Sequence, residues 1–161
     1  MNNPIQIITV VCTGNVCRSP MAERLLKHAL NGEDEPLNSI EVLSAGVSAF
    51  AGDPASDNSV RALAKVGIDL NDHRSRKISP QLMEKSDLIL AMTEGHLSIM
   101  QQLYPEFSGR MKLFGSFHQP QSPEVPDPFG GSLSLYSETR DNLAEFIPAI
   151  IQYLKDNNNE T

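Results

Sequence analysis

The chain has 161 residues, 40% hydrophobic and 20% charged, with a formal net charge of −7; this favours one soluble domain and argues against a nucleic-acid or anionic-membrane partner held by bulk charge. No stretch approaches the ~20 apolar residues of a membrane span, and Met1 to Val11 lacks the basic leader of a secretory signal. Because the only cysteines, Cys12 and Cys17, fall in one short segment, we expect a reducing cytoplasm, with neither a disulfide framework nor a zinc site.

Strands and helices are predicted to alternate along the chain. Ile5 to Val11 is a β-branched run typical of a strand buried on both faces. The strand breaks at Thr13, and Ser19 followed by Pro20 predicts the N-cap and first residue of a helix. Further strands are predicted over 40–45, 87–92 and 111–114, and further helices over 57–66, 82–85, 94–103 and 133–154, with a Pro-rich loop over 119–129.

The C-terminal part contains two irregular features. Pro148 lies inside the last predicted helix and should kink or interrupt it. The polar residues 156–161 are expected to fray. We therefore assign residues 1–156 to one domain and residues 157–161 to a polar C-terminal tail.

This alternation predicts an α/β fold, a single-domain three-layer α/β/α arrangement whose parallel strands are joined by right-handed crossovers. Ligands bind such sheets beyond the carboxyl ends of the strands. The segment 12–19 follows the first strand and therefore falls at that edge.

The same segment carries a motif with a chemical purpose: Cys12 and Arg18 are separated by five residues, and Ser19 follows. A loop between a strand and a helix can turn successive N–H groups inward and, with the helix dipole, bind a tetrahedral oxyanion. Arg18 can then grip two phosphate oxygens, with Cys12 beneath the phosphorus as the nucleophile. A lone cysteine at a strand end is more often a small buried hydrophobe, so the indication comes from the whole pattern, including Gly14–Asn15.

The loop and the helix start read CTGNVCRSPMAE, which closely resembles the phosphate-binding loop of the low-molecular-weight protein-tyrosine-phosphatase family. The resemblance continues through segments 44–46, 67–76, 87–93 and 127–130. It implies a four-stranded parallel sheet of flavodoxin-like type, no metal or organic cofactor, a phosphorylated protein as substrate, and a loop that also holds inorganic phosphate or other oxyanions. The implied substrate-binding residues are Thr13, Gly14, Asn15, Val16, Cys17, Ser19 and Phe129.

Asp127 lies between prolines and by itself would be a turn aspartate. The resemblance to the family's Asp-Pro-Tyr/Phe loop makes it the general acid. A phenolate of pKa ~10 leaves slowly unless a positioned group protonates it. The same carboxylate would then deprotonate the water that hydrolyses the cysteinyl-phosphate.

The resemblance also implies supporting roles. Asn15 would adopt a left-handed conformation held by Ser44 and His73, and Ser19 would donate a hydrogen bond to the sulfur of Cys12. Cys17 is either a small loop residue or a resolving thiol that traps oxidised Cys12 as a disulfide. The other histidines are expected to be half-exposed loop residues without a role: His28, His96 and His118.

Three other functions would share parts of this pattern with a tyrosine phosphatase. An arsenate reductase would need cysteines after Cys17, and a non-catalytic phosphate-binding module would lack Cys12, Arg18 or Asp127. A protein-arginine phosphatase, a branch of the same family, is closer, because Thr13 and the segments 90–93 and 127–131 resemble it. That branch carries threonine at the position of Val16, so the sequence favours phosphotyrosine.

Overall fold

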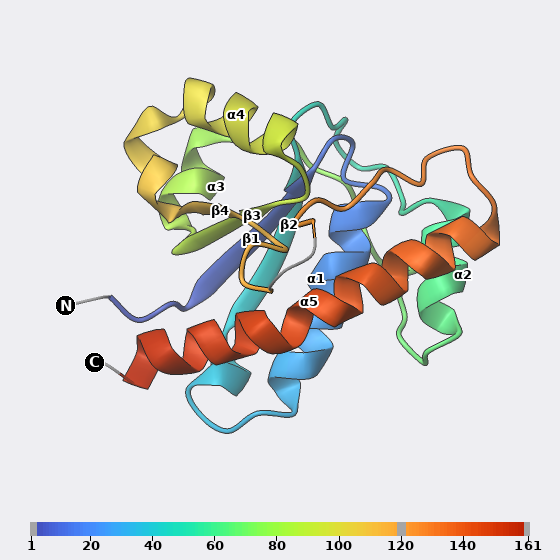
Figure 1. Cartoon of the computed structure of the whole chain (residues 1–161). Coiled ribbons are helices and arrows are strands. Elements are labelled where there is room, and N and C mark those ends of the chain that lie inside the picture. Colours follow the sequence, from blue (N-terminus) through green and yellow to red (C-terminus); the bar gives the residue numbers. More distant parts are fainter. Residues whose placement is uncertain (1–2, 119–121, 160–161) are drawn as a thin grey trace.

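Four parallel strands form the centre of the molecule in the computed structural model, which describes residues 3–118 and 122–159 (Figure 1). The predicted α/β class and parallel sheet are confirmed. The β-branched sequence of the first strand explains its place, since every residue from Ile8 to Cys12 is buried between two helical layers. In the order β2-β1-β3-β4, the strands are β1 (Ile7–Cys12), β2 (Glu41–Gly46), β3 (Leu88–Ala91) and β4 (Met111–Leu113).

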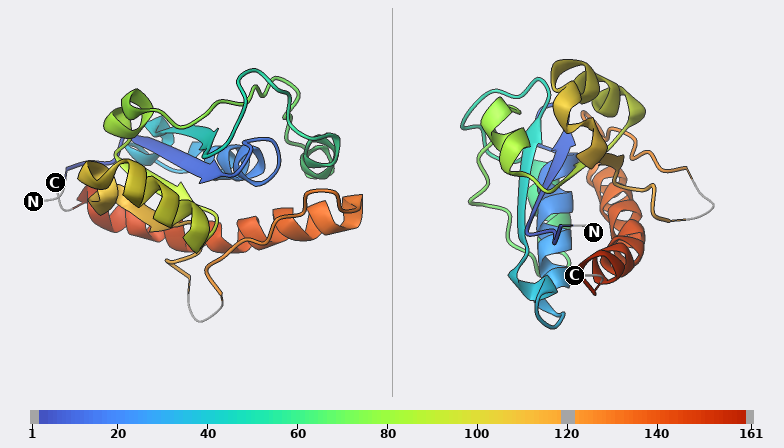
Figure 2. Two further views of the ribbon diagram at one scale, coloured as in Figure 1. Left: turned by 90° about the horizontal axis from the view of Figure 1, so that it is seen from above. Right: turned by 90° about the vertical axis from the view of Figure 1, so that its left-hand side faces the viewer.

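Helices cover both faces of this sheet (Figure 2). On one face Ile8 and Val10 pack with residues of α1 and α5, and on the other Val11 and Ile89 pack with residues of α3 and α4. The three-layer prediction is therefore confirmed. The helices are α1 (Arg18–Asn31), α2 (Asp57–Ala64), α3 (Pro80–Lys85), α4 (Glu94–Leu103) and α5 (Leu133–Asn159), with short 3-10 helices η1 (Leu37–Ser39) and η2 (Pro105–Arg110).

Helix α1 begins two residues earlier than Pro20, the predicted first helical residue. Cys17, not Ser19, occupies the N-cap position, and it makes no side-chain capping hydrogen bond. The prediction of Ser19 as the cap was wrong because its hydroxyl contacts the sulfur of Cys12 instead. The cap position is thus part of the loop that precedes the helix.

Helix α5 also departs from its prediction, because it runs without interruption through Pro148 to Asn159. Pro148 and Ala144, whose carbonyl loses its helical partner, are both exposed, so water can solvate that carbonyl. Near the helix end, Asn157 donates to the carbonyl of Asn3 over 3.1 Å, which brings the two ends of the described chain together (Figure 2). Of the expected tail, residues 157–159 are helical, and 160–161 lie outside the described residues, as do 119–121 of the Pro-rich loop.

Within residues 3–118 and 122–159, no helix combines the length and apolar character that a membrane crossing requires.

Candidate active site

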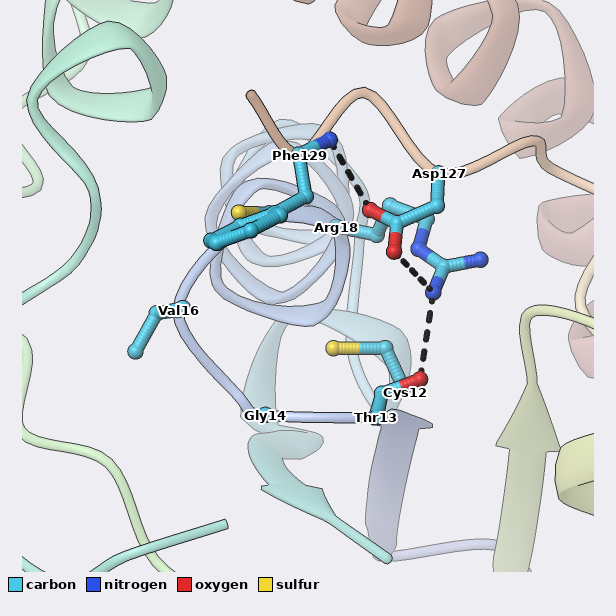
Figure 3. Close-up of a pocket in the computed structure, with 8 residues that line it drawn as sticks. Cys12, Thr13, Gly14, Val16, Arg18, Asp127 and Phe129 are labelled. Atoms are coloured by element: carbon cyan, nitrogen blue, oxygen red, sulfur yellow. Dashed lines mark hydrogen bonds and ion pairs between the residues drawn. The ribbon is translucent and has the colours of Figure 1, made fainter. Parts of the chain in front are cut away.

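The loop between β1 and α1 lies at the carboxyl edge of the sheet, where the sequence motif predicts the site. It forms one side of a pocket that Asp127 and Phe129 close from the other side (Figure 3). Cys12, Arg18 and Asp127 face the same space, so the structure brings together the three predicted catalytic side chains. The lining residues are Cys12, Thr13, Gly14, Val16, Cys17, Arg18, Asp127 and Phe129.

Backbone contacts with the segment after β2 fix the course of this loop. The carbonyls of Cys12 and Thr13 accept hydrogen bonds from the N–H groups of Val47 and Ser48, at 3.0 and 2.9 Å. At the end of β2, a Cβ on Gly46 would lie 2.5 Å from the carbonyl oxygen of Thr13, so only glycine permits this approach. These carbonyls bond outside the loop, which leaves the loop's own N–H groups available to an anion.

Asn15 holds the centre of the loop in a left-handed conformation, with φ of 55°. Its side-chain amide donates to the hydroxyls of Ser19 and Ser44, at 2.8 and 3.0 Å, and its Oδ1 accepts from the N–H of Arg76 at 2.9 Å. The buried His73 donates through Nε2 to the Asn15 carbonyl at 2.7 Å, and burial lowers the pKa of His73. The conformation and contacts expected of Asn15 are therefore present.

Cys12 is 2% exposed and its sulfur lies 2.9 Å from the hydroxyl oxygen of Ser19. Asn15 donates to that same oxygen, so the hydroxyl proton of Ser19 points away from Asn15, toward either the carbonyl of Ala45 at 3.3 Å or the sulfur of Cys12. It can be donated to the sulfur of Cys12 when that sulfur is a thiolate. Ser19 is thus placed to stabilise a nucleophile or a leaving group.

Arg18 is 3% exposed and ties the distant acid loop to the phosphate loop. Its Nη1 donates to the carbonyl of Val125 at 2.9 Å, and its Nη2 lies 3.6 Å from Oδ2 of Asp127. Its Nε is buried and has no hydrogen-bond partner among the described residues. A buried cationic donor of this kind is costly unless an anion completes it, so the pocket is built for an oxyanion.

Asp127 and Phe129 lie at the mouth of the pocket. The side chain of Asp127 is 49% exposed, and its Oδ1 accepts the N–H of Phe129 at 3.1 Å. Phe129 is 77% exposed and, like Val16, lies across the pocket from Arg18 (Figure 3). The mouth therefore combines one acid with an apolar border.

Cys17 lines the pocket, but its sulfur is occupied by neighbours outside the loop. It lies 3.2 Å from the hydroxyl of Tyr136 and 3.6 Å from that of Ser56. Burial raises the pKa of the Cys17 thiol and, with the Cys17 contact, that of Tyr136 to about 12. Both groups are therefore neutral near pH 7, and a resolving role for Cys17 stays a prediction.

His96 lies beside the site, although its local sequence predicted no role for it. It lies in the first turn of α4 and is 5% exposed, so the expectation of a half-exposed loop histidine was wrong. The expectation was also wrong for His28, which is exposed on α1, whereas His118 is half-buried in the loop after β4. The topology of the sheet could have indicated His96. The parallel strands β1 and β3 are neighbours, so the segments that follow them lie next to each other.

His96 connects α4 to the phosphate loop. Its Nε2 lies 2.8 Å from Oγ1 of Thr13, and its Nδ1 lies 3.1 Å from Oγ1 of Thr93. Burial and the positive charge of Arg18 lower the pKa of His96 to about 4. The imidazole is therefore neutral at pH 7.

This lowered pKa predicts an acid sensitivity of the fold. Between pH 6.5 and about 4 the unfolded chain protonates His96 while the folded protein does not, so acid favours unfolding. From about pH 7 to about pH 4.5 the free energy of unfolding should fall by roughly 2 kcal/mol more in the wild type than in His96→Gln, which cannot titrate. Urea unfolding at both pH values measures this difference. An equal fall in both proteins would contradict it, since the lowered pKa of His73 acts alike in each.

A parallel α/β sheet that carries a Cys-x5-Arg loop, with an aspartate docked above it, is the architecture of a cysteine-dependent phosphatase. The comparisons with known proteins agree. The model of the family described as "Low molecular weight phosphotyrosine protein phosphatase" matches residues 7–160. The chain belongs to this family and is a phosphatase.

Three relatives illustrate the range of the similarity. The protein-arginine-phosphatase of Bacillus subtilis is 40% identical, over 92% of this chain and 96% of the relative. The low molecular weight protein-tyrosine-phosphatase Etp of Escherichia coli is 38% identical, over 76% of each chain. A solved structure of the arginine phosphatase YwlE, a mutant with a phosphorylated active site serine, has a TM-score of 0.82 and 37% identity, over 92% of this chain and 95% of that one.

Proposed function

We propose that this protein is a protein-tyrosine phosphatase that hydrolyses phosphotyrosine in phosphorylated proteins through a cysteinyl-phosphate on Cys12. The observation that carries the proposal is the buried Nε of Arg18, which has no hydrogen-bond partner within residues 3–118 and 122–159, in a side chain that lines a pocket together with Cys12 and Asp127. An oxyanion between the loop's N–H groups and Arg18 would complete this donor. The phosphorus would then lie next to the sulfur of Cys12.

In the first step, the thiolate of Cys12 attacks the phosphorus, an S–P bond forms, and the bond from phosphorus to the tyrosine oxygen breaks. Asp127 gives its proton to the departing phenolate oxygen. Arg18 and the loop's N–H groups stabilise the charge that spreads over the three equatorial oxygens. The products are tyrosine and a cysteinyl-phosphate.

In the second step, the carboxylate of Asp127 removes a proton from water, which attacks the phosphorus and breaks the S–P bond. Inorganic phosphate leaves, and the thiolate of Cys12 departs with a hydrogen bond from Ser19 over the 2.9 Å separation. The relative with a phosphorylated active site serine supports a phosphoryl group carried by the enzyme. Because this chemistry needs a reduced Cys12, we place its action in the cytoplasm.

The border of the pocket supports phosphotyrosine as the substrate. Val16 offers an apolar surface beside the nucleophile, and the exposed ring of Phe129 offers a second one. A phenyl ring can lie between two such surfaces, and aromatic pairs contribute beyond the burial of area. The long acid loop would then reach the phenolic oxygen from above.

Phosphoarginine is the second candidate substrate. The Bacillus subtilis relative, at 40% identity, is a protein-arginine-phosphatase. A guanidinium can also stack on the ring of Phe129. The two candidates differ most clearly at Val16, where the resemblance to the arginine branch implies threonine.

Substituting Val16 by threonine should shift the preference toward phosphoarginine. The two side chains are nearly isosteric, but the threonine hydroxyl can hydrogen-bond a polar guanidinium or the attacking water. The ratio of kcat/KM for matched phosphotyrosine and phosphoarginine peptides should shift by ~10-fold, about 1.4 kcal/mol of differential transition-state binding.

Val16→Ala is the matched control, because it removes apolar surface without adding a hydroxyl. It should lower turnover of phosphotyrosine peptides without raising turnover of phosphoarginine peptides. If the wild type already favours phosphoarginine, the assignment to phosphotyrosine is wrong. If Val16→Thr leaves the ratio unchanged, recognition lies elsewhere in the pocket.

A further inference from the structure

Three side chains form a connected polar path from the first turn of α4 to the phosphate site. Nη2 of Arg18 lies 3.4 Å from Oγ1 of Thr13, and Nε2 of His96 lies 2.8 Å from the same oxygen. Thr13 lines the pocket, whereas His96 is buried behind it. The hydroxyl of Thr13 thus contacts both the buried imidazole and the guanidinium.

The direction of these hydrogen bonds follows from the groups involved. A guanidinium can only donate, so the oxygen of Thr13 accepts from Arg18. The cationic charge favours the opposite orientation for the Thr13 proton, away from Arg18 and toward the lone pair of Nε2 on His96. Each bond in such a chain polarises the next one.

The other side of the imidazole is consistent with this direction. Nδ1 of His96 lies 3.1 Å from Oγ1 of Thr93, an oxygen that already caps α4 by accepting the N–H of His96. A hydroxyl oxygen has two lone pairs, so Thr93 can accept from Nδ1–H as well. The neutral imidazole then carries its proton on Nδ1 and leaves Nε2 free to accept.

We propose that His96 is a positioning residue that acts through the hydroxyl of Thr13 to hold Arg18 in its phosphate-binding orientation. The inference rests on the proposed function, in which Arg18 binds the phosphoryl group. It adds a residue outside the loop and outside the pocket lining to the machinery of that site.

The position of Asp127 explains why Arg18 needs such a partner. Its Oδ2 lies 3.6 Å from the same Nη2 that donates to Thr13. Without an acceptor on the loop, Nη2 is drawn toward this carboxylate, and the guanidinium turns away from the phosphate. Nη2 carries two N–H groups, so it donates to Thr13 while it lies beside Asp127. The Thr13 hydroxyl offsets the pull of the carboxylate, and His96 fixes the hydroxyl in the orientation that accepts.

Substitutions at both positions test the path in the full-length enzyme. Thr13→Val keeps the shape but removes the hydroxyl, and His96→Leu removes the acceptor behind it. Each should lower kcat/KM for an aryl phosphate and weaken binding of inorganic phosphate by ~10-fold, whereas Thr13→Ser, which keeps the hydroxyl, should recover most of the loss that Thr13→Val causes. His28→Leu, the same change on the exposed face of α1, is the matched control and should leave both quantities unchanged.

The double variant separates a positioning role from a structural one. If His96 acts through Thr13, adding His96→Leu to Thr13→Val should lower kcat/KM by less than about 2-fold further. Fully additive losses would overturn the inference, because His96 would then act independently of the hydroxyl. Thermal unfolding of each variant shows whether its loss of kcat/KM results from a loss of protein stability instead. If the losses of kcat/KM follow the melting temperature alone, the inference is also wrong.

A measurement on the wild type does not depend on whether any variant folds. In a nitrogen–proton correlation spectrum at neutral pH, His96 should carry its proton on Nδ1, with Nε2 unprotonated. A proton on Nε2 would overturn the inference. Failure of the proposed function is distinguishable from both results, because the wild type would then favour a phosphoarginine peptide over the matched phosphotyrosine peptide, or hydrolyse neither.

Discussion

Replacing Cys12 by serine should abolish hydrolysis of aryl phosphates while the protein still folds and binds phosphate. A serine hydroxyl is a far weaker nucleophile than a thiolate, so turnover should fall by about 10⁴-fold or more. The oxyanion site remains, because Arg18 and the loop's N–H groups do not depend on the sulfur. Steady-state hydrolysis and the rise in melting temperature on adding phosphate measure the two properties separately.

Cys17→Ser is the matched control, since it makes the same change in the same loop. The sulfur of Cys17 contacts Tyr136 and Ser56 rather than Ser19, so its replacement should reduce hydrolysis far less. Hydrolysis by purified Cys12→Ser at a rate close to that of Cys17→Ser would contradict the covalent mechanism.

Replacing Asp127 by asparagine should slow the release of poor leaving groups far more than that of good ones. Asparagine cannot protonate the departing oxygen, and an aryl phosphate with a weakly acidic phenol depends on that proton. The expected loss is ~10²–10⁴-fold for the poor leaving group and much smaller for an acidic nitrophenol. The slope of log kcat/KM against phenol pKa across a series of aryl phosphates measures this dependence.

Glu124→Gln provides the control for this prediction. Glu124 lies on the same loop, but its carboxylate accepts the N–H of Glu94 at 2.6 Å and so caps α4 instead of facing the pocket. Its replacement should leave the slope unchanged. If Asp127→Asn lowered the rates of all substrates by one common factor, Asp127 would be a structural residue and the acid assignment would be wrong.

The fold was predictable because its strands are short, strongly apolar runs separated by clear helices. Residues such as Ile8 and Val10 are buried wherever a parallel sheet has two covered faces, so local pattern and final position agree. The first residue of α1 was harder to predict from the sequence, because Ser19 is a good capping residue in isolation. In the structure its hydroxyl contacts the sulfur of Cys12, so the contact within the site overrides the local preference of serine for the N-cap.

Other features depend on contacts that no local pattern contains. Pro148 is tolerated because it falls on the exposed side of a helix whose other side is packed in the core, with Phe146 and Ile150 buried. The end of α5 is ordered by polar contacts with the N-terminal segment, which a polar tail does not reveal. Local pattern alone made His96 an ordinary histidine, since its role depends on the neighbouring ends of β1 and β3.

The acid loop shows the same limit within the site. By its own sequence Asp127 is a turn aspartate, and only family resemblance made it the acid. Its place results from long-range hydrogen bonds of Val125, whose N–H donates to Met92 at 2.9 Å and whose carbonyl accepts from Arg18. These contacts join segments far apart in the chain, so spacing could not predict them.

Direct trapping of the phosphorylated enzyme tests the central claim, that Cys12 carries the phosphoryl group. The Asp127→Asn protein should accumulate this intermediate with a nitrophenyl phosphate, because the good leaving group departs without an acid while the second step lacks its base. Rapid quenching followed by peptide mass spectrometry should find one phosphoryl group on the peptide that contains Cys12. The Cys12→Ala protein, which keeps Cys17, should carry no phosphoryl group on any peptide. Steady nitrophenol release without any phosphate on Cys12, or with phosphate on another residue, would contradict the account.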